Sequence, residues 1–104
     1  MACELEAVRI LAWRIADQQS RNEMGLMDAA GVKVFGSELM EKLGHLVTDL
    51  LGPYGQVKHS KYAKLAGFGE SLYQACFVPI VSMGTNEIQR NIIAWYGLGL
   101  PRMK

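Results

Sequence analysis

Few side chains in this sequence have the type and spacing to do chemistry, and the first candidates are Glu41 and His45. They lie four residues apart, so on a helix both would share one face, where a carboxylate and an imidazole can bind a metal ion. A metal site in a helical bundle needs several inward carboxylates. The preceding helical segment offers only Glu4, Glu6 and Asp17, in a mostly outward pattern. We therefore expect no metal site.

The two cysteines, Cys3 and Cys76, are the candidates for thiol chemistry. They are far apart in the sequence, and neither has a second Cys or a His at metal-ligand spacing beside it. Isolated thiols of this kind are typical of reduced, partly buried cysteines that pack as small apolar residues.

The segment from Gly84 to Ala94 has the pattern of a loop that leads into a short amphipathic helix. Thr85 is a favoured N-cap residue, and Glu87 places a negative charge in the first turn, where it suits the helix dipole. The apolar residues Ile88, Ile92 and Trp95 follow at helical spacing, Gly97 supplies a stop, and Pro101 prevents the helix from resuming. Taken alone, Thr85 and Glu87 indicate only a capped helix.

Two long helices are predicted before this segment, joined by a short polar connection that would force them antiparallel. The first runs from Ala2 to about Arg21, and the second from about Met27 to Leu51. The predicted inward stripes are Leu5, Val8, Leu11, Ala12 and Ile15 on the first helix, and Val32, Phe35, Leu39, Leu43, Leu46 and Leu50 on the second.

Several glycines lie within the second predicted helix and in the turn that follows it. Gly31, Gly36 and Gly44 each cost about 1 kcal/mol relative to Ala inside a helix, which suggests close approach of a neighbouring helix or a ligand. The turn around Gly52 and Pro53 ends the second helix. Beyond it we expect a loop with one short helix near residues 69–75, while the apolar run 77–81 is ambiguous between helix and strand.

Bulk composition excludes several classes of protein. Eleven basic and ten acidic residues leave a net charge of +1, with neither sign gathered into a patch that would bind nucleic acid. No apolar run approaches the ~20 residues needed to span a membrane, and the N-terminus lacks the pattern of a signal peptide. We expect a single all-α domain in a soluble, cytoplasmic protein.

Taken together, the two long helices, the Leu-Leu-Gly-Pro-Tyr-Gly turn at 50–55 and the Gly-Thr-Asn-Glu-Ile-Gln-Arg segment at 84–90 resemble the C-terminal helical domain of the acyl-CoA dehydrogenases. The tail Gly-Leu-Gly-Leu-Pro-Arg at 97–102 is similar to that of bacterial members. In that family the domain is a four-helix bundle that follows a helical domain and a β-barrel domain. The resemblance implies that residues 1–104 are a partial domain, lacking its first helix and the two preceding domains.

The resemblance also implies a function. Family members oxidise an acyl-CoA to the 2,3-enoyl-CoA, passing electrons to FAD and then to an electron-transfer acceptor. By this resemblance, Thr85 and Glu87 match residues near the FAD, and the segment from Asp49 through Gly52 to Pro53 matches one that contacts the FAD of a neighbouring subunit. This chain departs from the family there, because many members have Gln where Asp49 stands and Gly where Pro53 stands. We expect the chain alone neither to retain FAD nor to be active.

Met83 marks a second departure from the family pattern. Many members carry the Glu that removes the substrate α-proton immediately before Gly-Thr, and a thioether has no proton affinity to replace it. The resemblance leaves three explanations open: a base on the missing first helix, a base supplied by an unlike partner subunit, or loss of dehydrogenation. No residue of this chain is therefore predicted to be catalytic.

Assembly is the remaining expectation. The apolar stripes of the two long helices would have packed against absent parts, and family members place this domain at the centre of a tetramer. We expect a homo-oligomer, with a hetero-oligomer as the alternative. A rival function from another class is a non-catalytic helical domain that serves only oligomerisation or interaction, or a non-catalytic subunit of a heteromeric enzyme.

Overall fold

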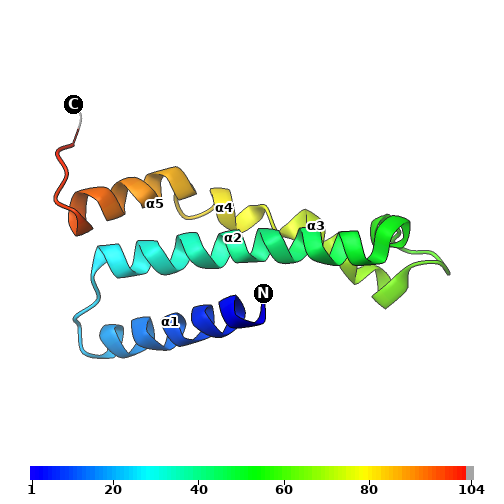
Figure 1. The fold of residues 1–104 in the computed structure, drawn as a ribbon, viewed down its shortest axis with the longest axis horizontal. Helices are drawn as coiled ribbons and strands as arrows, with labels where there is room; N and C mark the ends of the chain where they lie inside the picture. The colour runs from blue at the N-terminus through cyan, green and yellow to red at the C-terminus, as the bar shows by residue number, and fades with distance from the viewer. Residues whose placement is uncertain (103–104) are drawn as a thin grey trace. The chain divides into compact units, whose positions relative to one another are not determined.

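The computed structural model describes residues 1–102, and all regular structure in that range is helical. The elements in order are α1 (Ala2–Ser20), α2 (Leu26–Leu51), η1 (Gly52–Gln56), η2 (Lys64–Gly67), α3 (Phe68–Ala75), α4 (Val78–Val81), α5 (Asn86–Ile92) and η3 (Ile93–Gly97), as Figure 1 shows. The predicted all-α class and the two long helices are confirmed. The chain forms two compact units, residues 1–36 with 83–102 and residues 37–82, and α2 runs through both.

In the first unit, α1 doubles back onto the first part of α2 (Figure 1). The end of α1 is joined to the start of α2 by polar contacts to Asp28. Gln18 Nε2 donates to Asp28 Oδ2 over 3.1 Å, and the Arg14 guanidinium lies 3.6 Å from Asp28 Oδ1. These contacts hold the two helices of the hairpin together at their connected ends.

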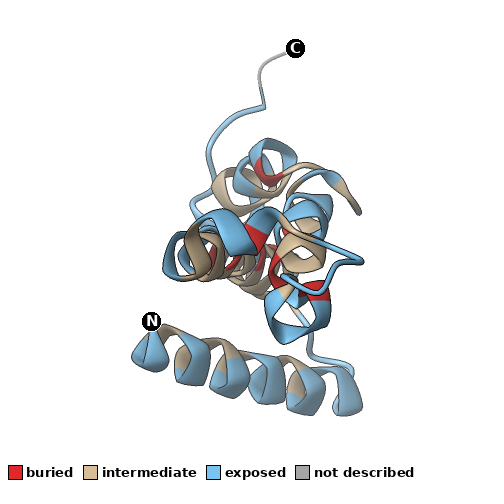
Figure 2. Ribbon diagram, turned by 90° about the vertical axis from the view of Figure 1, so that its right-hand side faces the viewer, coloured by how far each residue is buried: buried red, intermediate tan, exposed pale blue. Residues whose placement is uncertain are grey.

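The face of α1 that turns toward α2 differs in part from the predicted stripe. Val8, Leu11 and Ile15 are half-buried as expected, but Leu5 is 46% exposed and Ala12 is exposed. Figure 2 shows this narrow half-buried band on a helix that is otherwise exposed. Apolar residues lie almost all around α1, so their periodicity alone does not select the inner face. Every residue of α1 is described, and none is fully buried.

The stripe of α2 is likewise confirmed only in its first part. Leu39 is buried, and Val32, Phe35 and Leu43 are half-buried. Leu46 and Leu50 are 38% and 76% exposed, so their predicted inward placement is wrong in this chain. Within the second unit, the helical turns that follow α2 cover a different face of it and leave these two leucines open.

In the second unit, the end of α3 approaches α2 closely where Gly44 meets Cys76. A Cβ on Gly44 would lie 2.7 Å from the Cys76 Sγ and 3.0 Å from its Cβ, so close approach is confirmed at this glycine. Gly31 and Gly36 do not behave in this way. A Cβ on Gly31 would meet nothing within 4 Å, and one on Gly36 would make only ordinary contact with Val8.

Two further predictions concern residues 68–81. The expected short helix near 69–75 is confirmed as α3. The ambiguous apolar run contains α4, with Pro79 in its first turn, where a helix has no need of the missing N–H. Cys76 ends α3 fully buried, with its thiol donating to the Tyr73 carbonyl oxygen over 2.9 Å, whereas Cys3 is exposed.

The two glycines of α2 are predicted to respond oppositely to alanine. Gly44→Ala should lower the free energy of unfolding by about 1–3 kcal/mol, because the new methyl group overpacks against Cys76. Gly31→Ala should raise it by up to about 1 kcal/mol, because it gains helix propensity without a clash. Chemical denaturation of the two variants beside the unmodified chain measures both changes, and equal effects of the same sign would contradict this packing.

Candidate functional site

The closing segment, defined here as residues 83–92, gathers three of the residues singled out from the sequence. Thr85 takes an extended conformation before α5, and its Oγ1 accepts a hydrogen bond from the Ile88 N–H at 3.4 Å. The predicted N-cap is therefore confirmed. Met83, Thr85 and Glu87 all lie within this one segment of the first unit.

The Glu87 carboxylate is exposed and remains ionised more readily than an ordinary glutamate. The pKa of Glu87 is lowered first by its own backbone N–H, which donates to the carboxylate, and then by the Thr85 hydroxyl. The positive charges of Arg90 and Lys33 lower the pKa further. Glu87 thus supplies the negative charge that suits the start of α5.

Lys33 and Asn86 anchor the closing segment to α2. Asn86, the first residue of α5, is only 2% exposed, and its Oδ1 accepts a hydrogen bond from Lys33 Nζ over 2.6 Å. Our sequence predictions missed this pair. A usable signal is that Lys33 lies at helical spacing between Ala30 and Ser37, two small residues on the buried side of α2.

Met83 and Gly84 form the turn that enters α5. Both have left-handed backbones, with φ of +53° at Met83 and +83° at Gly84. The Met83 side chain is 84% exposed. The Met83 carbonyl oxygen accepts a hydrogen bond from Gln89 Nε2 over 2.9 Å. Position 83 is therefore held at the surface by a defined turn, and its thioether offers no group that could take a proton.

The other predicted site residues, Asp49 and Gly52, lie in the second unit, where α2 passes into η1. Asp49 is exposed and Gly52 has φ of +54°, a conformation that suits glycine. Beside them is a cavity of about 520 Å³, lined by His45, Thr48, Asp49, Gly55, Gln56, Glu70, Tyr73 and Gln74. The Glu70 carboxylate is paired with Lys58 at 3.1 Å.

These two segments do not fit the diphosphate of FAD by themselves. At the turn after α2, Asp49 offers only acceptor oxygens at neutral pH, Pro53 has no N–H, and the Thr48 hydroxyl already donates to the Gly44 carbonyl oxygen. At the start of α5, the N–H groups of Glu87 and Ile88 already donate to the chain's own oxygens. A diphosphate needs free donors, and none of these groups is one.

Glu41 and His45, the first metal candidates, form a loose pair on the second half of α2. His45 Nε2 lies 4.0 Å from Glu41 Oε1, and the imidazole packs edge-on against Tyr73 and Phe77 with ring centroids 5.3 and 6.0 Å apart. Across residues 1–102, no group of three or more potential ligand side chains could hold a metal ion. The same range contains no helix with the length and apolar character to cross a membrane.

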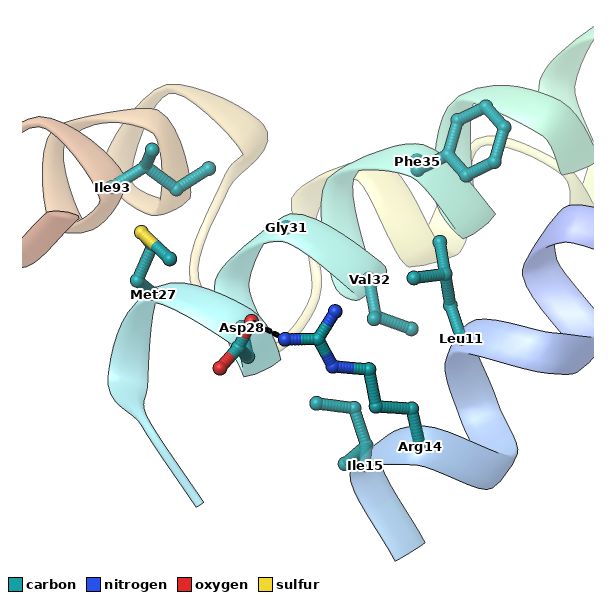
Figure 3. A pocket seen from close by; sticks show the side chains of 9 residues that line it. All are labelled: Leu11, Arg14, Ile15, Met27, Asp28, Gly31, Val32, Phe35 and Ile93. Carbon is teal, nitrogen blue, oxygen red and sulfur yellow. Dashed lines mark ion pairs between the residues drawn. The ribbon is translucent and has the colours of Figure 1, made fainter. Parts of the chain in front are cut away.

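A second cavity, of about 320 Å³, lies in the first unit between α1, α2 and η3. In Figure 3, Leu11, Arg14 and Ile15 of α1 reach toward α2, and the ion pair between Arg14 and Asp28 lies at one side. The remaining lining residues are Met27, Gly31, Val32, Phe35 and Ile93. The walls are mainly apolar, and none of the predicted site residues lines this cavity.

The chain combines two long helices with a Gly-Pro turn and a capped closing helix. The sequence model that matches it is the acyl-CoA dehydrogenase C-terminal domain, over residues 1–96. The chain therefore belongs to the acyl-CoA dehydrogenase family, and it is similar to that family's C-terminal helical domain in sequence and in fold.

Curated relatives support this membership. The chain is 36% identical over 101 residues to acyl-CoA dehydrogenase FadE26 of Mycobacterium tuberculosis, covering 93% of this chain and 25% of that protein. It is 31% identical over 94 residues to the human mitochondrial short-chain specific acyl-CoA dehydrogenase, covering 90% of this chain and 21% of that protein. The chain thus spans about a quarter or less of these relatives.

Two solved structures have the same fold over nearly the whole chain. The ChsE4-ChsE5 complex from Mycobacterium tuberculosis matches with a TM-score of 0.89 and 35% identity, covering 98% of this chain and 26% of that one. The Tcur3481-Tcur3483 steroid ACAD matches with a TM-score of 0.92 and 33% identity, covering 98% of this chain and 27% of that one.

The contacts of Glu87 predict a pH response that depends on Thr85. A carboxylate whose pKa is lower in the folded state stabilises that state above the unfolded pKa of about 4.3, and this contribution is lost as the pH falls through the lowered value. Thr85→Val should raise the Glu87 pKa part of the way back, because the hydroxyl donor is gone. It should also cost about 1 kcal/mol through loss of the N-cap.

Carbon-13 NMR titration of the Glu87 carboxyl measures the pKa, and Thr85→Ser is the matched control because it keeps the hydroxyl. Identical Glu87 titrations in the three proteins would show that Thr85 does not act on this carboxylate.

Proposed function

We propose that this chain is the C-terminal portion of a flavin-dependent acyl-CoA dehydrogenase that oxidises an acyl-CoA to the 2,3-enoyl-CoA. The observation that carries the proposal is the match of residues 1–96 to the family's C-terminal domain. An acyl-CoA substrate, an electron-transfer acceptor and a cytoplasmic location belong to the proposed parent protein. The matched relatives include both a short-chain and a steroid enzyme, so the proposal stops at acyl-CoA as the substrate class.

The proposed role of this chain is to build one wall of the parent enzyme rather than to catalyse. Its segments at Thr85 and Glu87, and at Asp49 and Gly52, would lie near FAD that is held mainly by residues outside the chain. This assignment agrees with the poor fit of both segments to a diphosphate. Met83 has no proton affinity, so the base that removes the α-proton would come from another part of the parent or from another subunit.

An unlike partner subunit is the second element of the proposal. The two similar structures pair ChsE4 with ChsE5 and Tcur3481 with Tcur3483. Met83 departs from the family pattern at the position of the base, and a base supplied by an unlike subunit is one explanation of that departure. A homo-oligomer remains the alternative assembly.

A non-catalytic interaction domain is the rival function, and one observation favours it. Large apolar side chains remain open on α1, with Leu5 at 46%, Ile10 at 57% and Trp13 at 69% exposure. Exposed apolar side chains of this kind are candidates for contact with another protein or another copy, and the exposed ion pair of Glu6 and Arg9 lies among them. The rival predicts association without flavin binding in any longer product of the same gene.

The test of the enzyme proposal compares two purified proteins. The 104-residue chain should be colourless and inactive with acyl-CoA, because one wall does not make a preorganised flavin site. The product that includes everything the same gene encodes before Met1, expressed alone and with candidate partner subunits, should be yellow and should reduce an electron acceptor when acyl-CoA is added. Stoichiometric flavin on the chain itself, or a longer product without flavin under every condition, would contradict the proposal.

The same flavoprotein allows a control at position 83. Met83→Ala should leave proton abstraction from a bound acyl-CoA intact, since the thioether is not the base. Abolished abstraction with flavin still bound would contradict this assignment.

Self-association of the chain is predicted from the exposed apolar side chains of α1. Sedimentation at micromolar concentration should give a mass above that of the 11.5 kDa chain. Trp13→Glu should shift the species toward monomer, because it replaces the most exposed large apolar side chain of α1 with a charge. Gln19→Glu, at an exposed position near the end of the same helix, is the matched control and should not. A chain that unfolds cooperatively and stays monomeric at every concentration would show that the exposed apolar side chains of α1 do not drive association.

A further inference from the structure

The turn that leads into α5 has a strained backbone and needs a stabilising interaction. Two consecutive residues, Met83 and Gly84, are left-handed. Gly84 adopts this conformation freely, but a residue with a Cβ is disfavoured there by roughly five- to thirtyfold. Met83 has no chemical means of its own to form local hydrogen bonds that would offset this, as Asn or Asp would.

Gln89 supplies the missing support. Its Nε2 donates to the Met83 carbonyl oxygen over 2.9 Å, from the second turn of α5 back across the entry turn. A Cβ at position 84 would lie 3.0 Å from the same nitrogen, so the amide rests directly over Gly84. The glycine and the amide therefore fit each other, and the hydrogen bond fixes the direction of the residue-83 carbonyl.

The helix that carries Gln89 is itself fixed. The Thr85 cap orders the first turn of α5, and the partly buried bond from Lys33 to Asn86 attaches that turn to α2. Gln89 thus projects from a helix that is held in place, and its amide bonds to Met83, the residue of the closing segment with a strained backbone. The result is a side chain at position 83 that is 84% exposed and points away from the unit.

We propose that Gln89 is a positioning residue for position 83: its amide holds the left-handed turn that presents the residue-83 side chain outward. The purpose of this device rests on the proposed function, in which position 83 faces the reaction site. Because residue 83 is methionine here, the turn presents an apolar, polarisable contact for the acyl-CoA rather than a base. The geometry of the device does not depend on that function.

A double-mutant cycle on the 104-residue chain tests the proposal at one fixed protein concentration. The variants are Gln89→Leu, Met83→Gly and both together. Gln89→Leu should lower the left-handed population at residue 83 by roughly two- to tenfold when that residue is Met, as measured from its carbon-13 shifts. When residue 83 is Gly, the left-handed shifts should persist, because glycine takes this backbone conformation without support. This retained conformation in the glycine background is the readout that a simple packing role would not give.

Gln19→Leu on α1 is the matched control, since it replaces an exposed helical glutamine away from the turn, and its effect should be the same in both backgrounds. If a variant fails to fold, a measurement on the unmodified chain still tests the proposal. In the unmodified chain, NMR should show slowed exchange for one side-chain amide proton of Gln89 and left-handed carbon-13 shifts at residue 83. Equal effects of Gln89→Leu in both backgrounds, or a freely exchanging Gln89 amide, would overturn the proposal.

The two proposals fail separately. A longer gene product without flavin would refute the enzyme function and leave the outcome of the cycle unchanged. If the enzyme is confirmed, Gln89→Leu in the flavoprotein should raise KM for acyl-CoA with flavin content unchanged. An unchanged KM would show that Gln89 has no role at the reaction site, even if the double-mutant cycle shows that it holds the turn.

Discussion

The hydrogen bond from Lys33 to Asn86 is the interaction on which the closing segment depends. It joins residues 53 positions apart, and it links α5 to α2 in the first unit. Loss of either side chain would remove this partly buried hydrogen bond, at a cost of about 1–3 kcal/mol. The cap at Thr85, the charge at Glu87 and the turn at Met83 all take their places from a helix that this bond holds.

A lysine at this point also needs an explanation in terms of charge. The start of a helix carries partial positive charge, which disfavours a nearby ammonium group. Glu87 supplies the compensating charge, and Lys33 in turn helps to lower the Glu87 pKa. Glu87 thus offsets part of the positive charge that Lys33 and Arg90 bring to the start of α5. The motif at 84–90 has a structural role, because it caps this helix and attaches it to α2.

Local structure was predictable from the sequence where the cause is local. The cap at Thr85, the stop after α2 and the short helix α3 follow from residue type and spacing. The inner face of α1 was not, because Leu5 and Ala12 are as apolar as residues that do face α2. The pairing of Lys33 with Asn86, and the left-handed backbone of Met83, arise from contacts and constraints that no local pattern records. Of the site residues, the grouping of Met83, Thr85 and Glu87 was evident from their adjacency, whereas the hydrogen bond at the Met83 carbonyl needed coordinates.

The two thiols differ in their access to solvent, because Cys3 is exposed and Cys76 is buried. Burial, with a smaller contribution from the charge of Glu41, raises the pKa of the Cys76 thiol, so this side chain stays protonated and shielded between α3 and α2. Cys3 is exposed in the first turn of α1. A thiol-reactive dye would therefore attach at one place without any engineered cysteine, and its colour and mobility would report directly on whatever covers that helix.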